Sequence, residues 1–507
     1  WTARRNQVVD AFRHAWKGYR QDAFGSDEYA PMAHRGFNLS SRGLGYTIVD
    51  SLDTMLIMNL DAEYKEARDW VAHSLDFNIE GDAVSVFETN IRTLGGLLSA
   101  HHLSKQDPIY LTLAVDLADR LMKAWTLNND YPSKFVYLAL SPEGSPERIA
   151  ENQNMESWKT SLISLAEVGT LQLEFAYLSH LTKDPKYHRK AQAVMRSIQQ
   201  ITPLDGLWPV FMDPFNNSPY SGDITMGAHG DSYYEYLLKQ WIQTRGHADQ
   251  KVYRDMYDAS VEGVKRHLVR QTVSTNIALV HHLKSPYKPQ FFPKAEHLSC
   301  FLPGLLALGA TRGYSLAEIQ AGRTAQGTPI THTMQVRDQE DLDLAEKLAY
   351  GCWQLYDFTA TGLAPEMVRF RGYQREGSPY LTRTSAAQKY IGLPRTQCDF
   401  DIPPDRGFNL LRPETIESLF ILWRITKKVE YREMGWKIFM AFEKFARLES
   451  GGYTSLHDVT VVPPPREDKM ETFFLAETLK YLYLLFSPDS VVPLTEYVFN
   501  TEAHPFP

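Results

Sequence analysis

Cysteine is scarce in this chain, whose 507 residues include only three: Cys300, Cys352 and Cys398. Three cysteines cannot form a disulfide scaffold, and the simplest arrangement is one pair and one free thiol. The fold must therefore be stabilised mainly by hydrophobic burial, which a hydrophobic content of 43% allows.

Long apolar runs and basic clusters are also missing. No apolar stretch reaches the roughly 18 residues that would identify a membrane-spanning helix, and no signal peptide is visible. With a net charge of -8 and no basic block, the chain is a poor candidate for binding nucleic acid or anionic membranes. The first residue is Trp1 rather than Met, which leaves room for an upstream segment or anchor that has been removed.

Several familiar catalytic motifs are absent. There is no HExxH, so the pairs His101–His102 and His281–His282 do not form a zincin site. There is no GxSxG, no P-loop and no EF-hand loop. A metal site in this chain must therefore be assembled from residues that lie far apart in the sequence.

What the chain has in abundance is helical periodicity. Some segments are amphipathic, such as 3–24 and 61–77, whereas others, such as 46–59 and 414–426, are apolar on nearly all sides with isolated acids. This alternation favours two concentric layers, with outer helices half solvated and inner helices buried. Without a linker between segments, we expect one all-α domain over 1–507, with short β pieces near 206–211 and 274–283. Helices are predicted near residues 3–24, 46–59, 61–77, 87–103, 109–126, 159–182, 185–200, 231–245, 251–271, 297–308, 340–358, 414–426, 429–447 and 467–486.

Isolated carboxylates recur at the starts of the apolar helices or within them. Glu414 and Glu417 follow Pro413 in the first turn of an apolar helix, three residues apart and so on one face. Each acid alone is more simply explained as a favourable charge at a helix N-terminus or as half of a salt bridge. Together they predict one acidic cavity, which could hold a hard cation or catalyse glycoside hydrolysis. The other acids of this set are Glu88, Glu167, Asp231, Glu366, Glu477 and Glu502.

Taken in order, several segments resemble the class I α-1,2-mannosidases, glycoside hydrolase family 47. They are VDSLDTMLIMNL, FETNIRTLGGLLSAHHLS, GDSYYEYLLKQW, HLSCFLPG, TGLAPE, NLLRPETIESLF, FFLAETLKYLYLLF and FNTEAHP. The resemblance covers essentially the whole chain, and YYEYLLKQW is closest to the endoplasmic-reticulum branch of the family. It implies an (α/α)7 barrel of inner and outer helices, and an inverting reaction that uses one Ca²⁺ ion.

The resemblance also implies roles for individual residues. Glu88 and Asp231 are the two candidates for the acid, and Glu414 is the candidate base that activates the attacking water. Thr501 resembles a threonine that contacts calcium through its carbonyl and its hydroxyl. The remaining pocket positions are Glu417, Glu477 and Glu502, expected to hold the waters of the ion or sugar hydroxyls; Arg92, Glu167, His297, Glu366 and Arg412; and Phe474, expected to form an apolar floor.

Cys300 and Cys352 match the structural disulfide of the family, which would leave Cys398 free and implies an oxidising compartment. One departure is His229, which stands where the endoplasmic-reticulum branch carries an arginine that helps to choose the glycan branch. Histidine cannot reproduce the bidentate contacts of arginine, so the branch preference is open. The sequons at Asn38 and Asn216 weakly favour a secretory compartment.

The resulting hypothesis is a monomeric, calcium-dependent exo-α-1,2-mannosidase that trims high-mannose N-glycans on glycoproteins. It would act in the lumen of the endoplasmic reticulum or Golgi, or after secretion. The alternative is a related glycan-binding quality-control protein with weak or no hydrolysis. The presence of all three catalytic candidates and of Thr501 argues against that alternative.

Overall fold

The computed structural model describes residues 1–125, 130–139, 162–284, 288–372 and 399–507. Within them, seven helices form an inner ring in which each helix contacts the next. A π-helical turn, Phe474–Thr478, precedes the last helix of the ring and contacts the first, which closes the circle. The inner helices are α2 (Tyr46–Met58), α5 (Gly95–Leu103), α9 (Gln172–Thr182), α11 (Asp231–Gln243), α13 (Leu302–Thr311), α16 (Glu414–Thr426) and α18 (Leu479–Leu485).

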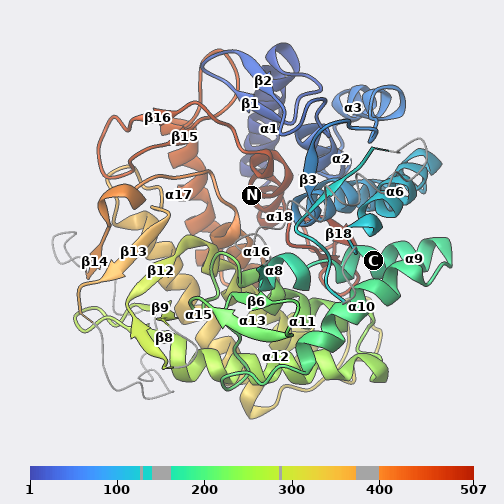
Figure 1. Ribbon diagram of the computed structural model, residues 1–507. Coiled ribbons are helices and arrows are strands. Elements are labelled where there is room, and N and C mark those ends of the chain that lie inside the picture. Colours follow the sequence, from blue (N-terminus) through green and yellow to red (C-terminus); the bar gives the residue numbers. More distant parts are fainter. Residues whose placement is uncertain (126–129, 140–161, 285–287, 373–398) are drawn as a thin grey trace.

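An outer ring of seven helices surrounds the inner one in the described part of the chain (Figure 1). Six outer helices pack on the inner helix that precedes them in the chain, and α1 packs on α18. The two rings confirm the predicted (α/α)7 barrel, in which amphipathic helices cover apolar ones. The outer helices are α1 (Thr2–Asp22), α3 (Asp61–His73), α6 (Pro108–Leu121), α10 (Lys186–Gln199), α12 (Lys251–Gly263), α15 (Val336–Asp357) and α17 (Val429–Phe445).

Short antiparallel strands lead into several inner helices and fix where those helices start. Each of Glu88, Glu167 and His297 lies within three residues of the end of such a strand. The pairings are β1 (Glu28–Ala30) with β2 (Arg35–Phe37), β3 (Ala83–Ser85) with β4 (Phe135–Tyr137), β5 (Ile163–Ser164) with β6 (Phe211–Asp213) and β6 with β7 (Ser218–Ser221), β8 (Val269–Gln271) with β9 (Ala278–Val280), β10 (His282–Lys284) with β11 (Gln290–Phe292), β12 (Lys294–Glu296) with β13 (Met367–Phe370) and β13 with β14 (Phe400–Asp401), β15 (Ser455–Leu456) with β16 (Arg466–Glu467), and β17 (Val498–Phe499) with β18 (Pro505–Phe506).

Three predicted helices differ in the structure. The helix predicted at 159–182 begins outside the described residues and is then replaced by β5, α8 (Leu165–Gly169) and α9, with a break at Thr170 and Leu171. The helix predicted at 251–271 ends earlier, because Val269–Gln271 pairs with β9. Residues 466–467 likewise pair with β15, so the last predicted helix starts later than 467. β5 pairs with a distant segment, whereas β8–β9 and β15–β16 are local hairpins, and in each case strand pairing overrides local helical periodicity.

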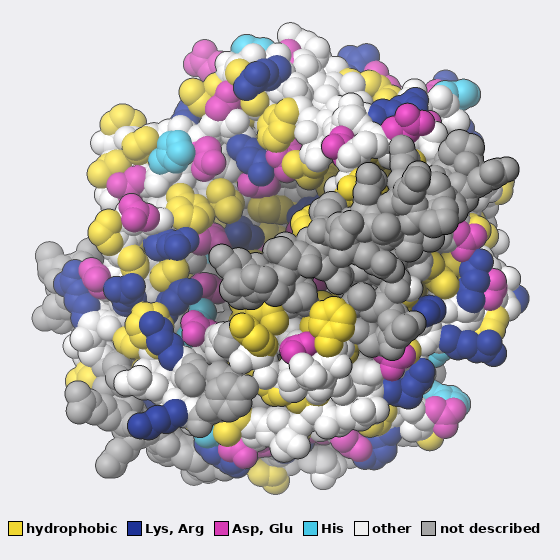
Figure 2. Space-filling view, viewed as in Figure 1, with side chains coloured by type: hydrophobic (Ala, Val, Ile, Leu, Met, Phe, Trp, Pro, Cys, Tyr) yellow, Lys and Arg dark blue, Asp and Glu magenta, His cyan; other side chains and the backbone are white. Residues whose placement is uncertain are grey.

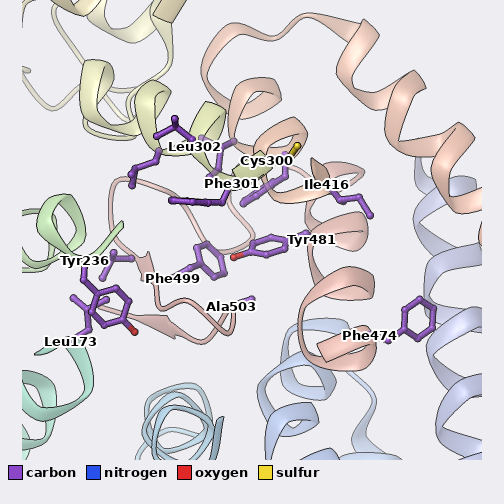
Figure 3. Close-up of a cluster of buried hydrophobic side chains, with 14 of the residues drawn as sticks. Leu173, Tyr236, Cys300, Phe301, Leu302, Ile416, Phe474, Tyr481, Phe499 and Ala503 are labelled. Carbon is purple, nitrogen blue, oxygen red and sulfur yellow. The ribbon is translucent and has the colours of Figure 1, made fainter. Parts of the chain in front are cut away.

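The hairpin of β17 and β18 lies inside the barrel. Contacts of β17 with α11 and of β18 with α5 place it among the inner helices. In Figure 3 the hairpin with Phe499 and Ala503 runs between Tyr236 on one side and Tyr481 on the other. Residues 500–504 form the turn of this hairpin and approach the barrel axis. There Thr501 and Glu502 lie among residues from the N-terminal and C-terminal parts of the chain.

Cys300 and Cys352 form the predicted disulfide, which joins the start of the α13 region to α15 with a Cα–Cα distance of 5.9 Å. Closing a loop of 52 residues is worth about 4 kcal/mol in the loop-entropy account of disulfides. Cys398, predicted to be free, lies outside the described residues. Over the described ranges, no helix combines the length and the apolar character needed to cross a membrane.

Candidate active site

A cavity of about 280 Å³ lies at the N-terminal ends of the inner helices. Helix N-termini present unpaired N–H groups and a positive dipole end, which favours acids there. Six of the acids predicted from the sequence lie in the first turn of a helix and line the cavity as well: Glu88, Glu167, Asp231, Glu414, Glu417 and Glu477. Eleven of the predicted site residues line this cavity: Glu88, Arg92, Glu167, His229, Asp231, Arg412, Glu414, Glu417, Glu477, Thr501 and Glu502.

Glu414 is held in place by two neighbours. His297 shares a hydrogen bond of 2.9 Å between Nδ1 and the Glu414 carboxylate, and its Nε2 lies 2.8 Å from the Tyr356 hydroxyl. The Arg412 guanidinium lies 3.8 Å from the other carboxylate oxygen of Glu414. Burial alone would raise the pKa of Glu414, but the hydrogen bond with His297 and the charge of Arg412 outweigh it and lower that pKa. Glu414 is thus kept ionised, as a base must be.

Asp231 has the opposite environment. It begins α11, and one of its carboxylate oxygens accepts the backbone N–H of Ser232 at 2.8 Å. Burial, together with the charges of Glu235, Glu296 and Glu414, raises the pKa of Asp231 to about 7. Asp231 and Glu414 therefore face one cavity with their pKa values pushed apart, which is the pattern of a general acid and a general base.

Glu88 is a third carboxylate at the cavity, with a side chain that is 40% exposed. It ends the short helix α4 (Val86–Glu88), and Ser85 caps that helix by accepting the N–H of Glu88. Arg92, one turn later in the π-helical segment Thr89–Leu94, donates to Glu88 at 2.9 Å. Glu88 is thus an accessible carboxylate paired with a cation.

The deepest part of the cavity is crowded with carboxylates. Burial and the charges of Glu502, Glu414 and Glu417 raise the pKa of Glu477 well above its usual range. Burial also raises the pKa of Glu417 and that of Glu502 to about 8 each, despite the nearby charges of Lys239 and Arg92 respectively. Burial is the first cause of each of these shifts, and the neighbouring carboxylates add to it.

Two arginines flank an aromatic ring in the cavity wall. The guanidinium of Arg92 lies 5.9 Å from the centre of the Phe473 ring, and that of Arg412 lies 5.7 Å from it. Glu366 does not line the cavity itself, but it fixes Arg412 by accepting from its Nε at 2.7 Å. His297 likewise lies behind Glu414 rather than on the cavity surface.

The prediction for Phe474 needs correction. Its ring is fully buried, packs 4.8 Å from the Tyr453 ring and 5.8 Å from the Phe442 ring, and is not part of the cavity wall. Figure 3 shows Phe474 apart from the residues around the hairpin turn. Its neighbour Phe473 lines the cavity instead. The resemblance had implied Phe474 for this position, and the structure moves the role by one residue at the start of a π-helical turn.

His229 and Glu167 lie at the outer part of the site. His229 is exposed, adopts a left-handed φ of 70° and sits with its ring 5.1 Å from that of Phe211. Lys134 pairs with Glu167 at 3.2 Å. Figure 2 shows acidic and basic side chains interspersed over one face of the molecule.

Comparisons with known proteins agree over the whole chain. The sequence profile of glycosyl hydrolase family 47 matches residues 11–507. The chain belongs to this family. It is 44% identical to a mannosyl-oligosaccharide 1,2-alpha-mannosidase of Arabidopsis thaliana, covering 100% of this chain and 79% of the relative. It is 42% identical to the endoplasmic reticulum mannosyl-oligosaccharide 1,2-alpha-mannosidase of Schizosaccharomyces pombe, covering 100% of this chain and 90% of the relative.

A solved structure supports the fold of this family-47 chain. The alpha-1,2-mannosidase from Trichoderma reesei superposes with a TM-score of 0.81 at 26% identity, and the alignment covers 100% of this chain and 99% of that one. The likeness therefore includes both helical rings and the C-terminal hairpin, not only part of the barrel.

Several residues of the family-47 cavity were not among the predicted site residues. Glu235 lines the cavity one turn after Asp231, and Lys239 beneath it pairs with both Glu235 and Glu417. The spacing of Asp231, Glu235 and Lys239 at four-residue intervals along one helix could have revealed this stripe. Leu298 and Phe301, which follow strand β12, form an apolar part of the cavity wall.

Proposed function

We propose that this chain is an inverting α-1,2-mannosidase that removes terminal α-1,2-linked mannose from high-mannose N-glycans. The observation that carries the proposal is the pair of carboxyl groups Asp231 and Glu414, which face one cavity with opposite pKa shifts. The names of the relatives, mannosyl-oligosaccharide 1,2-alpha-mannosidases, supply the substrate class. The disulfide supports an oxidising compartment, which fits the lumen of the secretory pathway.

In the proposed reaction, Glu414 accepts a proton from water as that water attacks the anomeric carbon. His297 and Arg412 keep Glu414 ionised and oriented. Asp231, which can hold a proton near neutral pH, donates it to the departing sugar oxygen. Phe473 offers an apolar face to the sugar ring, between the two arginines. One carboxylate activates water while another carboxylic acid protonates the leaving group, as inverting glycosidases require.

The acidic floor of the cavity is formed by Glu417, Glu477, Thr501 and Glu502, and it fits a calcium ion. Thr501, Glu417, Glu477 and Glu502 present hard oxygen atoms, which Ca²⁺ prefers. Burial, with the charges of neighbouring carboxylates, raises the pKa values of the three glutamates, and a bound cation would favour their ionised forms. Among the described residues, no three His, Cys, Asp or Glu side chains converge as a ready metal site. When bound, a calcium ion would orient sugar hydroxyls and water by Lewis-acid coordination.

Removal of calcium should abolish turnover. With EDTA-treated protein we expect release of mannose to fall to background, because the carboxylates of the floor then repel one another and lose the group that orients the substrate. Adding Ca²⁺ back should restore the rate and raise the melting temperature. Mannose release at the full rate from metal-free protein would contradict the calcium role.

The pH dependence of kcat/KM should be bell-shaped. Asp231 is active when protonated, so the rate should fall as pH rises through about 7, where Asp231 loses its proton. Glu414 is active when ionised, and its lowered pKa should place the acid limb below the ordinary range for a glutamate. A pH–rate profile on a mannose disaccharide measures both limbs. A rate that rises through pH 8 and above would contradict the assignment of Asp231.

The proposal is tested by incubating the protein with the nine-mannose N-glycan and following free mannose by NMR. Inversion at an α-linkage releases β-mannose first, whereas initial release of the α-anomer would overturn the mechanism. The same time course identifies the eight-mannose isomer that accumulates, which reads out the branch preference left open by His229.

A further inference from the structure

We propose that Glu174 is a positioning residue that sets the Thr501–Glu502 turn for metal binding through Asn500. The proposal rests on the calcium role of Thr501 proposed above. Glu174 lies on the inner helix α9 and does not line the cavity. It is fully buried, and no step of the proposed reaction uses it. Burying a carboxyl group costs free energy unless its oxygens are fully hydrogen-bonded, so the presence of Glu174 in the core needs an explanation.

The partners of Glu174 come from three other parts of the chain. The Tyr236 hydroxyl donates to it at 2.6 Å, and the side-chain amides of Asn500 and Asn90 donate at 2.8 Å and 3.0 Å. Tyr236, Asn500 and Asn90 are each fully buried as well. Glu174 thus acts as an acceptor for donors from α11, from the C-terminal hairpin and from the π-helical segment that carries Arg92.

Asn500 transmits this constraint to the metal-binding turn. Its side-chain carbonyl accepts the backbone N–H groups of Glu502 at 2.9 Å and His504 at 2.8 Å, while its amide donates to Glu174 and to the Ile91 carbonyl. All four hydrogen bonds fix the orientation of one amide group. The direction of that amide determines where the peptide groups around Thr501 and Glu502 point.

The turn also contains a residue in an unfavourable backbone conformation, which the surrounding contacts must hold. Ala503 adopts a left-handed φ of 59° although it carries a Cβ atom, a conformation that persists only where its surroundings impose it. The Thr501 N–H also approaches the Tyr236 hydroxyl at 3.4 Å, so Tyr236 touches both Glu174 and the turn. Because neighbours behind metal ligands tune affinity by orienting the ligands, Glu174 should affect calcium binding without contacting the ion.

Two substitutions test this role. Glu174→Gln keeps the shape but replaces one carboxyl oxygen by an NH₂ group, which must then face the amide donor of Asn90 or Asn500. Tyr236→Phe removes only the hydroxyl that joins Glu174 to the turn. A matched control is Tyr253→Phe, which removes a buried tyrosine contact with Gln192 on the outer helices, away from the turn.

The experiment is calorimetric titration of CaCl₂ into the chelator-treated full chain, with melting temperatures measured with and without Ca²⁺. We expect Glu174→Gln to weaken calcium binding by about 10- to 100-fold, the usual effect of losing a group behind a metal ligand. Tyr236→Phe should weaken it by a smaller factor, and Tyr253→Phe should leave it unchanged while lowering the melting temperature. Turnover by Glu174→Gln should recover at saturating Ca²⁺.

Calcium affinity of Glu174→Gln within twofold of the wild type would overturn the inference. If Glu174→Gln does not fold, Asn500→Asp decides, because its carboxylate still accepts the Glu502 and His504 N–H groups but cannot donate to Glu174. Wild-type calcium affinity in that variant overturns the inference equally. A wild-type chain that binds no calcium would instead refute the proposed metal role, so the two failures are distinguishable.

Discussion

Glu414→Gln should reduce mannose release by about 10³-fold or more, because general-base assistance of this kind contributes roughly 10²- to 10⁴-fold and the amide cannot take up the proton of the attacking water. The substitution is nearly isosteric, so the shape of the cavity should persist. Hydrogen bonding to His297 can continue through the amide oxygen. The measurement is kcat on a mannose disaccharide, with the melting temperature as a test of folding.

The matched control for this variant is Glu430→Gln. Glu430 occupies the first turn of the next helix, α17, and is exposed, so the change removes a first-turn charge without touching the cavity. We expect this control to retain the wild-type rate. Similar losses in both variants would mean that removal of a first-turn charge, rather than loss of a base, causes the effect. An undiminished rate in Glu414→Gln would refute its role as base.

The barrel was predictable because its two kinds of helix differ in composition. Helices such as α2 and α16 are apolar on nearly every side, and periodicity alone assigned them to an inner layer. The strand pairing that shortened the helix after Lys251 was missed, because helical periodicity does not reveal the hairpin that β8 forms with β9 a few residues later. Local periodicity therefore succeeds where one layer buries a whole helix, and fails where the chain leaves a helix for a short strand.

The sequence indicates which acids belong to the site, but it does not predict how they are arranged in space. Motif by motif, the sequence indicates Glu88, Asp231 and Glu414, yet nothing in their spacing predicts that two of them acquire opposite pKa shifts. Those shifts come from neighbours such as Arg412 and His297, and His297 is 117 residues from Glu414. The bond between Glu174 and Asn500 joins positions 326 residues apart. Such pairings depend on ring closure and become visible only in three dimensions.

The second large expected effect concerns the proton donor, which is either Asp231 or Glu88. The raised pKa of Asp231, caused first by burial and then by nearby carboxylates, keeps a proton available near neutral pH. Glu88 is half-buried and pairs with Arg92 at 2.9 Å, so its side chain is engaged with a cation at the cavity wall. We therefore expect both Asp231→Asn and Glu88→Gln to slow hydrolysis of a mannose disaccharide by about 10²- to 10⁴-fold, the range for lost acid–base groups.

A change of leaving group separates the two. Fluoride departs from α-mannosyl fluoride without needing a proton, so a variant that lacks the proton donor should lose far less activity on this substrate than on the disaccharide. We expect that rescue in Asp231→Asn and not in Glu88→Gln. Asp231→Asn should also fold at least as stably as the wild type, because the raised pKa of Asp231 means that its ionised form is disfavoured in the folded protein above pH 4. Rescue of Glu88→Gln instead would make Glu88 the donor, and would leave the pKa shift of Asp231 as a consequence of the acidic cavity rather than a device for catalysis.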